Sequence, residues 1–194
     1  MSNHAKRKKL VYTFYETQNE GKWAESFNYL APQFQSVWDS KGGVNGFVRG
    51  YKLVQDISDI TVEDIRDMDS SSHFEVDYKV RETILSHPLT DAIKSSQMKD
   101  RKAFNDQSEK FMDFLVSIGG DKEEANKLQL RHFFSDNGVN AMIYLVGLDY
   151  TPEVLQHFNQ NETIYKDKRF ANVVDVDGKP AIANLKFNRH QLPS

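Results

Sequence analysis

His73-Phe-Glu-Val-Asp-Tyr-Lys-Val-Arg-Glu-Thr-Ile84 is the stretch that decides the fold class. From Phe74 to Arg81, apolar and charged side chains alternate strictly. Successive side chains of a strand point to opposite faces, so the pattern predicts a half-buried strand with one wet face. We interpret the charged set as an exterior cross-strand ladder, since the apolar set must face inward. The alternative is a polar cluster inside a cavity that grips an anionic or polar ligand. The charged residues are Glu75, Asp77, Lys79 and Arg81.

Further strands are expected on both sides of this stretch. Ile57–Ile65 predicts a strand with degraded alternation, joined to the first by a turn at Asp69–Ser72. Near the end of the chain, two apolar runs flank Asp177-Gly178, a dipeptide favoured in tight hairpin turns. Ala141–Val146 is apolar and has the length of a buried strand, and Phe34–Trp38 is a weaker strand candidate. The hairpin runs are Phe170 to Val176 and Ala181 to Phe187.

Helical spacing marks the start of the chain. Residues 5–35 predict two helices, interrupted at Gly21 and closed by Pro32, and a short third helix begins near Phe47. Residues 89–135 show aromatic residues at helical spacing, with Asp121 as an N-cap, and are expected to form a helical insertion or cap. A short helix is also expected after Thr151-Pro152. The fold class is therefore α+β, in a single domain that spans residues 1–194.

Composition excludes several classes of function. The chain has 194 residues, a net charge of −3 and no cysteine, so it has no thiolate nucleophile and no cysteine-ligated metal site. The charge gives no overall reason to bind nucleic acid, and none is expected as a partner. No apolar run reaches the length of a transmembrane segment, about 20 residues. Without a signal peptide the chain is expected to be cytoplasmic; the alternative is an exported or envelope-attached domain whose leader has been removed.

Both ends of the chain resemble one superfamily. Phe14-Tyr-Glu-Thr-Gln-Asn-Glu-Gly-Lys-Trp23 and Phe27-Asn-Tyr-Leu-Ala-Pro-Gln-Phe34 are similar to the opening of NTF2-like (cystatin-like, SnoaL-like) domains. Val173-Val-Asp-Val-Asp-Gly-Lys-Pro-Ala-Ile-Ala-Asn-Leu-Lys-Phe187 is similar to their closing hairpin. Gly43-Val-Asn-Gly-Phe-Val-Arg-Gly-Tyr51 looks most like accessory domains of bacterial exported or envelope proteins. The resemblance implies a cone, in which a curved antiparallel sheet wraps around the N-terminal helices.

Such a cone leaves an apolar cavity, a natural site for a small ligand. The resemblance favours a non-catalytic domain that binds a protein or a small apolar or amphipathic ligand, and that forms a homodimer through its convex sheet face. Alternatives are an isomerase or lyase with a carboxylate base in the cone, and an assembly subunit of a bacterial envelope or conjugative transfer machine. The expected cavity residues are Tyr12, Tyr15, Phe27, Trp38 and Tyr78.

Asp39 lies near the position of the isomerase base in that superfamily, and it is the candidate catalytic residue. The position of the family's tyrosine donor aligns with Phe14, which cannot donate a hydrogen bond, so binding is favoured over catalysis. As a turn residue, Asp39 has a plain structural explanation. The histidines show no metal-ligand spacing, and neither a metal nor a cofactor is expected. The basic run Lys6–Lys9 is interpreted as a solvated lead-in to the first helix, although it could contact phosphates, a membrane surface or an acidic partner.

Overall fold

A computed structural model of the chain describes residues 1–96 and 100–191. It divides into two compact units. The first combines Met1–Glu82 with Thr163–Ser194, and the second is Thr83–Glu162. The boundaries fall inside the two central strands.

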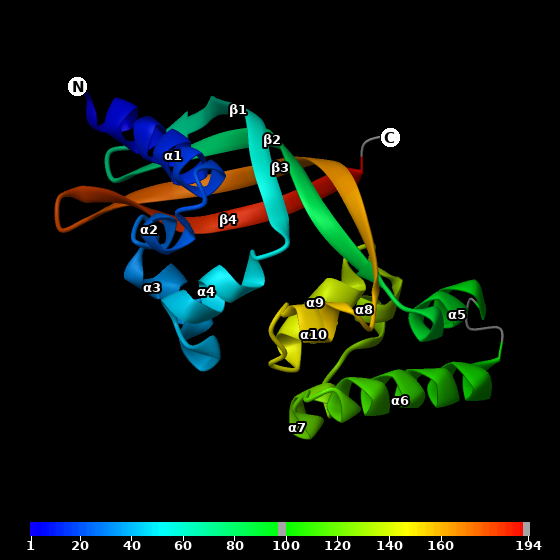
Figure 1. Cartoon of the computed structure of the whole chain (residues 1–194). Helices are drawn as coiled ribbons and strands as arrows, with labels where there is room; N and C mark the ends of the chain where they lie inside the picture. Colours follow the sequence, from blue (N-terminus) through cyan, green and yellow to red (C-terminus); the bar gives the residue numbers. More distant parts are fainter. Residues whose placement is uncertain (97–99, 192–194) are drawn as a thin grey trace. The chain divides into compact units, whose positions relative to one another are not determined.

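The first unit contains the short helices of the N-terminal third and most of the sheet (Figure 1). Among the described residues, the strands form one curved, unclosed, antiparallel sheet in the order β1-β2-β3-β4. The chain is therefore α+β, as predicted. The elements are α1 (Asn3–Asn19), α2 (Trp23–Phe27), α3 (Pro32–Gln35), the 3-10 helix η1 (Ser36–Lys41), α4 (Val44–Gly50), β1 (Val54–Asp67), β2 (Ser71–Ser86), β3 (Asn159–Val176) and β4 (Lys179–Gln191).

Helix α1 lies across one face of this sheet and contacts β1 and β4 (Figure 1). Its N-cap is Ser2, whose hydroxyl accepts from the Ala5 N–H. After its end, Gly21 adopts a φ of 76°, the left-handed conformation expected for a C-cap glycine. Val11, Phe14 and Tyr15 are buried and form the face that α1 turns to the core.

Strand β2 confirms the predicted alternation. Phe74, Val76, Tyr78 and Val80 are at most 4% exposed. On the opposite face, the Lys79 ammonium lies 3.1 Å from the Asp59 carboxylate, and the Arg81 guanidinium lies 2.7 Å from that of Asp56. Lys168 of β3 pairs with Glu75. The charged face is thus the cross-strand ladder favoured by the sequence.

The closing hairpin agrees with prediction, whereas the turn expected at Asp69–Ser72 lies slightly earlier, because β1 ends at Asp67 and β2 begins at Ser71. Asp177 and Gly178 have φ values of 50° and 77°, as a two-residue turn of the I′ type requires. The degraded alternation of β1 coincides with a register shift between Ser58 and Thr61, where Asp59 has a φ of 53°. A β-bulge of this kind adds a residue to one strand and disturbs its period of two.

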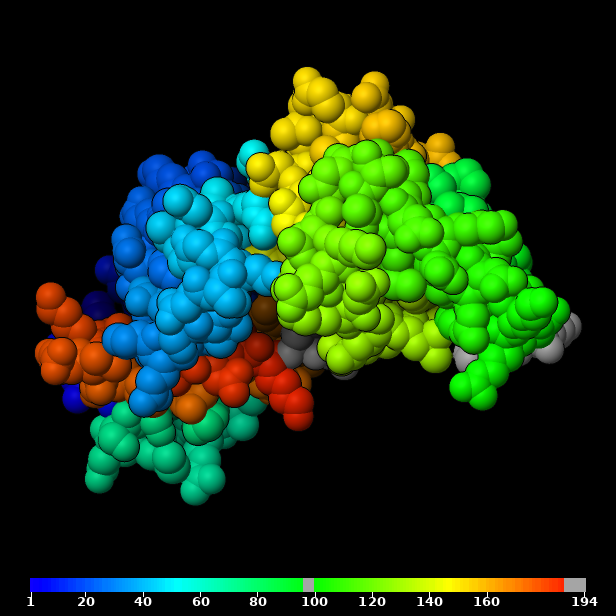
Figure 2. Space-filling view, turned by 90° about the horizontal axis from the view of Figure 1, so that it is seen from below, coloured from blue at the N-terminus to red at the C-terminus, as the bar shows by residue number. Residues whose placement is uncertain are grey.

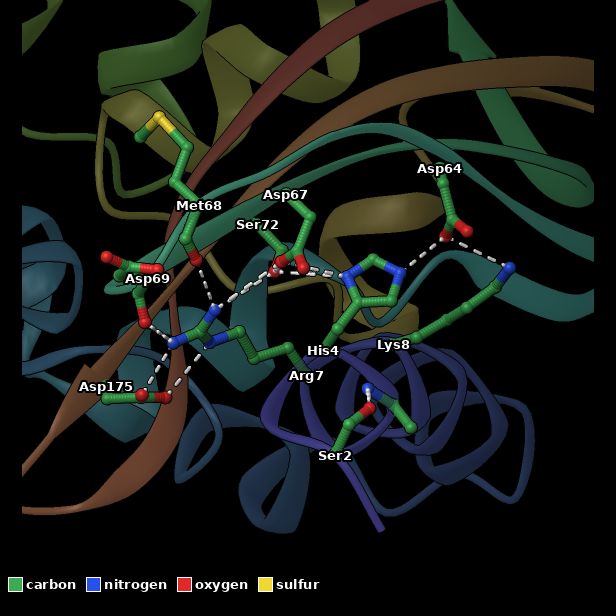
Figure 3. Close-up of polar contacts among 11 residues, drawn as sticks. Ser2, His4, Arg7, Lys8, Asp64, Asp67, Met68, Asp69, Ser72 and Asp175 are labelled. Atoms are coloured by element: carbon green, nitrogen blue, oxygen red, sulfur yellow. Dashed lines mark hydrogen bonds and ion pairs between the residues drawn. The ribbon is translucent and has the colours of Figure 1, made fainter.

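Arg7 joins α1 to both hairpins (Figure 3). Its side chain is 1% exposed, and Nη2 lies 2.6 Å from Asp175 Oδ2 in β3. Nη1 and Nη2 also donate to the carbonyl oxygens of Met68 and Asp69 in the β1–β2 turn, at 3.0 and 2.9 Å. The predicted solvated lead-in is therefore wrong at Arg7, because two turn carbonyls and a carboxylate take up its donors. Next to it, the Lys8 ammonium lies 3.1 Å from Asp64.

Two strand predictions are wrong. Phe34–Trp38 lies in α3 and η1, and Pro32 begins α3 at its first position rather than closing the preceding helix. Ala141–Val146 lies largely in α9 (Gly138–Leu145) of the second unit. A short apolar run buried on several sides has no period that separates strand from helix, and here the helix is formed.

The second unit is helical between its strand segments. Its helices are α5 (Pro88–Ser96), α6 (Arg101–Ser117), α7 (Lys122–Asn126), α8 (Leu130–Phe134), α9 and α10 (Pro152–Leu155). The helical character predicted for residues 89–135 is confirmed by α5 to α8, while residues 97–99 lie outside the described part. Asp121 is the N-cap of α7, as predicted, although the helix ends sooner than expected and α8 is separate.

Candidate functional site

The first unit encloses a cavity of about 250 Å³ between its helices and the inner face of the sheet. Most of its wall is aromatic, and its polar side chains other than tyrosine come from α1 and β3. The aromatic side chains are Phe14, Tyr15, Trp23, Phe34, Trp38, Phe47, Tyr51 and Tyr78. The polar and charged side chains other than tyrosine are Gln18, Asp167 and Arg169.

The short helices between residues 23 and 51 build the aromatic wall. The rings of Trp23 and Tyr51 stack with centroids 4.6 Å apart and planes 5° apart. Trp38 meets Phe47 edge to face at 5.1 Å. In Figure 2, the light-blue and cyan atoms of this segment form one closely packed body that lies against the red atoms of β4. Offset and edge-to-face ring contacts of this kind hold the wall in one arrangement.

Gly46 permits the close approach of α4 to η1 that this wall needs. A Cβ atom at Gly46 would overlap the carbonyl oxygen of Lys41. Before it, Gly42 and Gly43 have φ values of 95° and 65°, which turn the chain between the two helices. The glycines in this segment therefore serve to place Trp38 and Phe47 side by side.

Arg169 lies at the polar end of the cavity, where its Nε donates a 2.8 Å hydrogen bond to the hydroxyl of Tyr78. Asp167, two residues earlier on the same face of β3, is 1% exposed. Tyr15 is also 1% exposed, and its hydroxyl has no hydrogen-bond partner in the described part of the chain, which leaves out the side chains of residues 96 and 187–191. A buried hydroxyl without a partner is uncommon and needs an explanation.

Burial dominates the electrostatics of this end. It raises the pKa of Tyr78 to about 12 and the pKa of Tyr15 well above its ordinary value. The charge of Arg169 opposes this rise in pKa at both hydroxyls, and the charge of Asp167 reinforces it. Burial acts to lower the pKa of Arg169, but the neighbouring tyrosine hydroxyls, Tyr78 first, outweigh it and the pKa is raised. At neutral pH the phenols therefore keep their protons and the guanidinium keeps its charge.

The structure places Tyr15, Trp38 and Tyr78 on the cavity wall. Phe27 lies outside the described lining and packs against Trp38, with centroids 6.0 Å apart. Tyr12 also lies outside it, and its hydroxyl accepts from the Val62 N–H at 3.2 Å.

The candidate base Asp39 is exposed in η1 and is not among the described residues that line the cavity. The carboxylate on the wall belongs instead to Asp167. Asp167 and Arg169 were missed by the sequence analysis, although a signal was present. Val173 and Ala171 belong to the apolar, inward face of the predicted hairpin, and every second residue of a strand lies on the same face. Counting back along the chain in steps of two from Ala171 reaches Arg169, Asp167 and Tyr165.

Among the described side chains, those of residues 1–95 and 100–186, no group of three or more histidine, aspartate or glutamate residues is placed to hold a metal ion. In the same part of the chain, no helix has the length and apolar character needed to cross a bilayer. The cavity of the first unit combines an aromatic wall with buried polar side chains, and it is the candidate site.

Comparison with known proteins assigns no family to the chain. A scan against protein-family models, a search of curated proteins and a search of solved structures each found no significant match. Any function must therefore be argued from the cavity itself.

Proposed function

We propose that the first unit is a non-catalytic binding domain that holds a small, largely aromatic molecule in its cavity. The observation that carries this proposal is the combination of an aromatic wall with a buried polar end, formed by Arg169, Asp167 and Tyr15. Ligand sites in proteins are typically concave and mostly apolar, with a few polar groups that fix orientation. This cavity has both features.

Its volume suits a ligand of one or two rings. A cavity of about 150 Å³ in another protein binds benzene. The volume of about 250 Å³ in this unit leaves room for a second ring or a short polar substituent. The chain's only two tryptophans, Trp23 and Trp38, both lie on the wall, so tryptophan fluorescence reports on this site alone.

We also propose that the unit is a cone of the NTF2-like type. The curved sheet carries α1 on one face, and the closing hairpin of β3 and β4 belongs to the same sheet as β2. Both features are compatible with such a cone, and they support the resemblance seen at the two ends of the sequence. In this proposal the cavity is the interior of the cone.

The location of Asp39 argues against the catalytic role that the resemblance implied for it. The base expected by analogy with isomerases, Asp39, faces solvent. Asp167 is buried and lines the same cavity as Arg169, two residues away on β3. A general base must reach a substrate proton, and an exposed side chain outside the cavity does not.

Isothermal titration calorimetry with 2-naphthamide tests the binding proposal. The compound has about 13 non-hydrogen atoms, and at about 0.4 kcal/mol per atom it would bind with a dissociation constant on the order of 100 µM. Val54→Phe fills the cavity from β1 and should weaken binding about tenfold or more. Ile65→Phe, on the same strand but 54% exposed and outside the lining, is the matched control and should leave the affinity unchanged. Absence of saturable binding, or equal binding by Val54→Phe, would contradict the proposal.

A further inference from the structure

We propose that a groove on the charged face of the sheet binds the carboxyl end of a peptide chain whose last residue is apolar. This groove is separate from the aromatic cavity, and the two share no described lining residue. The proposal is carried by basic side chains without partners, by exposed apolar side chains next to them, and by a buried amide oxygen that lacks a donor.

The groove begins where the ladder of ion pairs ends. Lys79 and Arg81 lie 3.1 and 2.7 Å from aspartates, and Lys168 pairs with Glu75. Two residues away from Glu75 on β2 and from Lys168 on β3, the same face forms a groove of about 380 Å³, a volume typical of ligand sites. Its described lining belongs wholly to the first unit. The basic residues of the lining are Arg66 of β1, His73 of β2 and Lys186 of β4.

The groove lacks the carboxylates that the ladder has. No aspartate or glutamate is among its described lining residues. Within the part of the chain that the structure describes, Arg66, His73 and Lys186 form no hydrogen bond or ion pair. Lys79 and Arg81 obtain their carboxylates from the chain itself, whereas a carboxylate in the groove must come from a ligand. A guanidinium matches the geometry of a carboxylate, so Arg66 is suited to hold one.

Apolar side chains lie beside these charges. Phe170 and Ile65 line the groove, and both are exposed. The register shift between Asp64 and Arg66 makes Ile65 an extra residue of β1 opposite β2. A bare inorganic anion would leave both apolar side chains in water, whereas an apolar group next to the bound carboxylate would cover them. The ligand is therefore an anion with an apolar group close to its charge.

Asn172 adds a hydrogen-bonding group to the groove. Its Oδ1 is buried, and no described residue donates to it. A buried acceptor without a donor is uncommon and needs an explanation. The last torsion of an asparagine side chain is soft, so the amide can turn this oxygen toward an N–H of a ligand. The final residue of a peptide has an N–H, a side chain and a carboxylate on neighbouring atoms, one for each part of the groove.

Two peptides that differ only in their terminal group test the site. An acetylated peptide of glycine and serine that ends in leucine and phenylalanine is titrated into the unmodified full chain by calorimetry, as the free acid and as the carboxamide. The acid should bind about tenfold or more tightly, and replacing its last two residues by glycine should weaken it about fivefold or more. Equal binding of acid and carboxamide, or no saturable binding of the acid, would overturn the proposal. Equal binding of the peptide that ends in glycine would show a site for anions alone and would overturn the peptide assignment.

Arg66→Gln tests the charge of the groove and should weaken binding of the acid about fivefold or more. Arg81→Gln is the matched control, because it removes the same charge from the same face of the sheet outside the groove. It should leave the affinity unchanged, since exposed charges further away are screened by salt. Equal losses in the two variants would mean that the peptide responds to net charge and has no site at Arg66.

Phe170→Ala tests the apolar part in the same way. It should weaken the peptide that ends in phenylalanine about threefold or more, whereas Ile164→Ala should have no effect. Ile164 is also an exposed apolar residue of β3, and it is not among the described residues of the groove. Asn172→Leu keeps a side chain of similar size without the acceptor, and it should weaken the acid about threefold or more. Unchanged affinity in folded Phe170→Ala and Asn172→Leu would overturn the proposed mode of binding.

Discussion

The guanidinium Nε of Arg169 and the hydroxyl of Tyr78 are joined by a hydrogen bond of 2.8 Å. This bond connects the inner faces of β3 and β2 at the polar end of the cavity. It occupies the hydroxyl oxygen of Tyr78 as an acceptor and orients the guanidinium toward the tyrosines. Arg169 is thus part of the framework of the site as well as a charge in its wall.

Tyr78→Phe should destabilise the fold by about 1–2 kcal/mol, because it removes an acceptor from a largely buried cation. Tyr15→Phe is a matched control from the same cluster, since the hydroxyl that it removes has no described partner. Urea unfolding of the two variants should show a clear loss for Tyr78→Phe and almost none for Tyr15→Phe. Equal losses would mean that the bond between Arg169 and Tyr78 contributes nothing.

Tyr15→Phe should behave differently once ligand is present. If the acceptor of the ligand pairs with the Tyr15 hydroxyl, the variant should bind 2-naphthamide about threefold to tenfold more weakly, while its affinity for naphthalene stays the same. Titration calorimetry with both compounds measures the difference. A parallel loss for naphthalene would show that the ring of Tyr15 had shifted, and would remove the hydroxyl from the binding scheme.

Arg7→Met should cost at least about 2 kcal/mol of stability, because it leaves the Asp175 carboxylate and two turn carbonyls without their donors. Lys9→Met, an exposed substitution on the same helix, should cost almost nothing. Urea unfolding at pH 7 compares the two variants. Similar midpoints would show that Arg7 does not join α1 to the hairpins in solution (Figure 3).

The ion pair between Arg7 and Asp175 predicts that the stability of the fold depends on pH in the acid range. The hydrogen bond from Arg7 holds the pKa of Asp175 below its ordinary value of 3.8. A carboxyl whose pKa is depressed on folding stabilises the fold above its unfolded pKa, and this contribution is lost as the pH falls through the folded value. Stability should therefore decline below about pH 4, and Asp175→Asn should flatten the decline. Asp113→Asn, at an exposed position of α6, should leave the acid profile unchanged.

His87 predicts that the stability of the second unit also depends on pH. Burial against Phe111 and Phe114 lowers the pKa of His87 below 6.5, and its Nδ1 accepts from the Leu89 N–H at 3.1 Å. The unfolded chain then binds the proton more readily, so stability should fall as the pH drops below about 6.5. Hydrogen exchange in α5 and α6 should be faster at pH 5.5 than at pH 7.5 after correction for intrinsic rates. His87→Asn keeps an acceptor at the start of the helix and should abolish the difference.

Local patterns were strong enough to predict most strands and turns. The alternation from Phe74 to Val80 and the Asp177-Gly178 turn each have a single physical explanation, and both were predicted correctly. Ala141–Val146 was not, because an apolar run without polar interruptions is compatible with strand or helix, and tertiary packing decides.

The site was predicted only in part, for a related reason. Tyr15, Trp38 and Tyr78 belong to elements whose inward faces could be inferred, and all three line the cavity. Arg169 and Asp167 are charged, and charged residues in a strand are assigned to the wet face by default. Their inward position depends on the register of β3, which extends beyond the apolar run that marked the hairpin.

A crystal structure of the chain with 2-naphthamide is the most direct test of the binding proposal. The ring system should lie within the first unit against Trp23, Trp38 and Tyr51, with the amide at the end formed by Arg169 and Asp167. Ligand density outside this cavity, or a cavity that stays closed to the compound at saturating concentration, would contradict it.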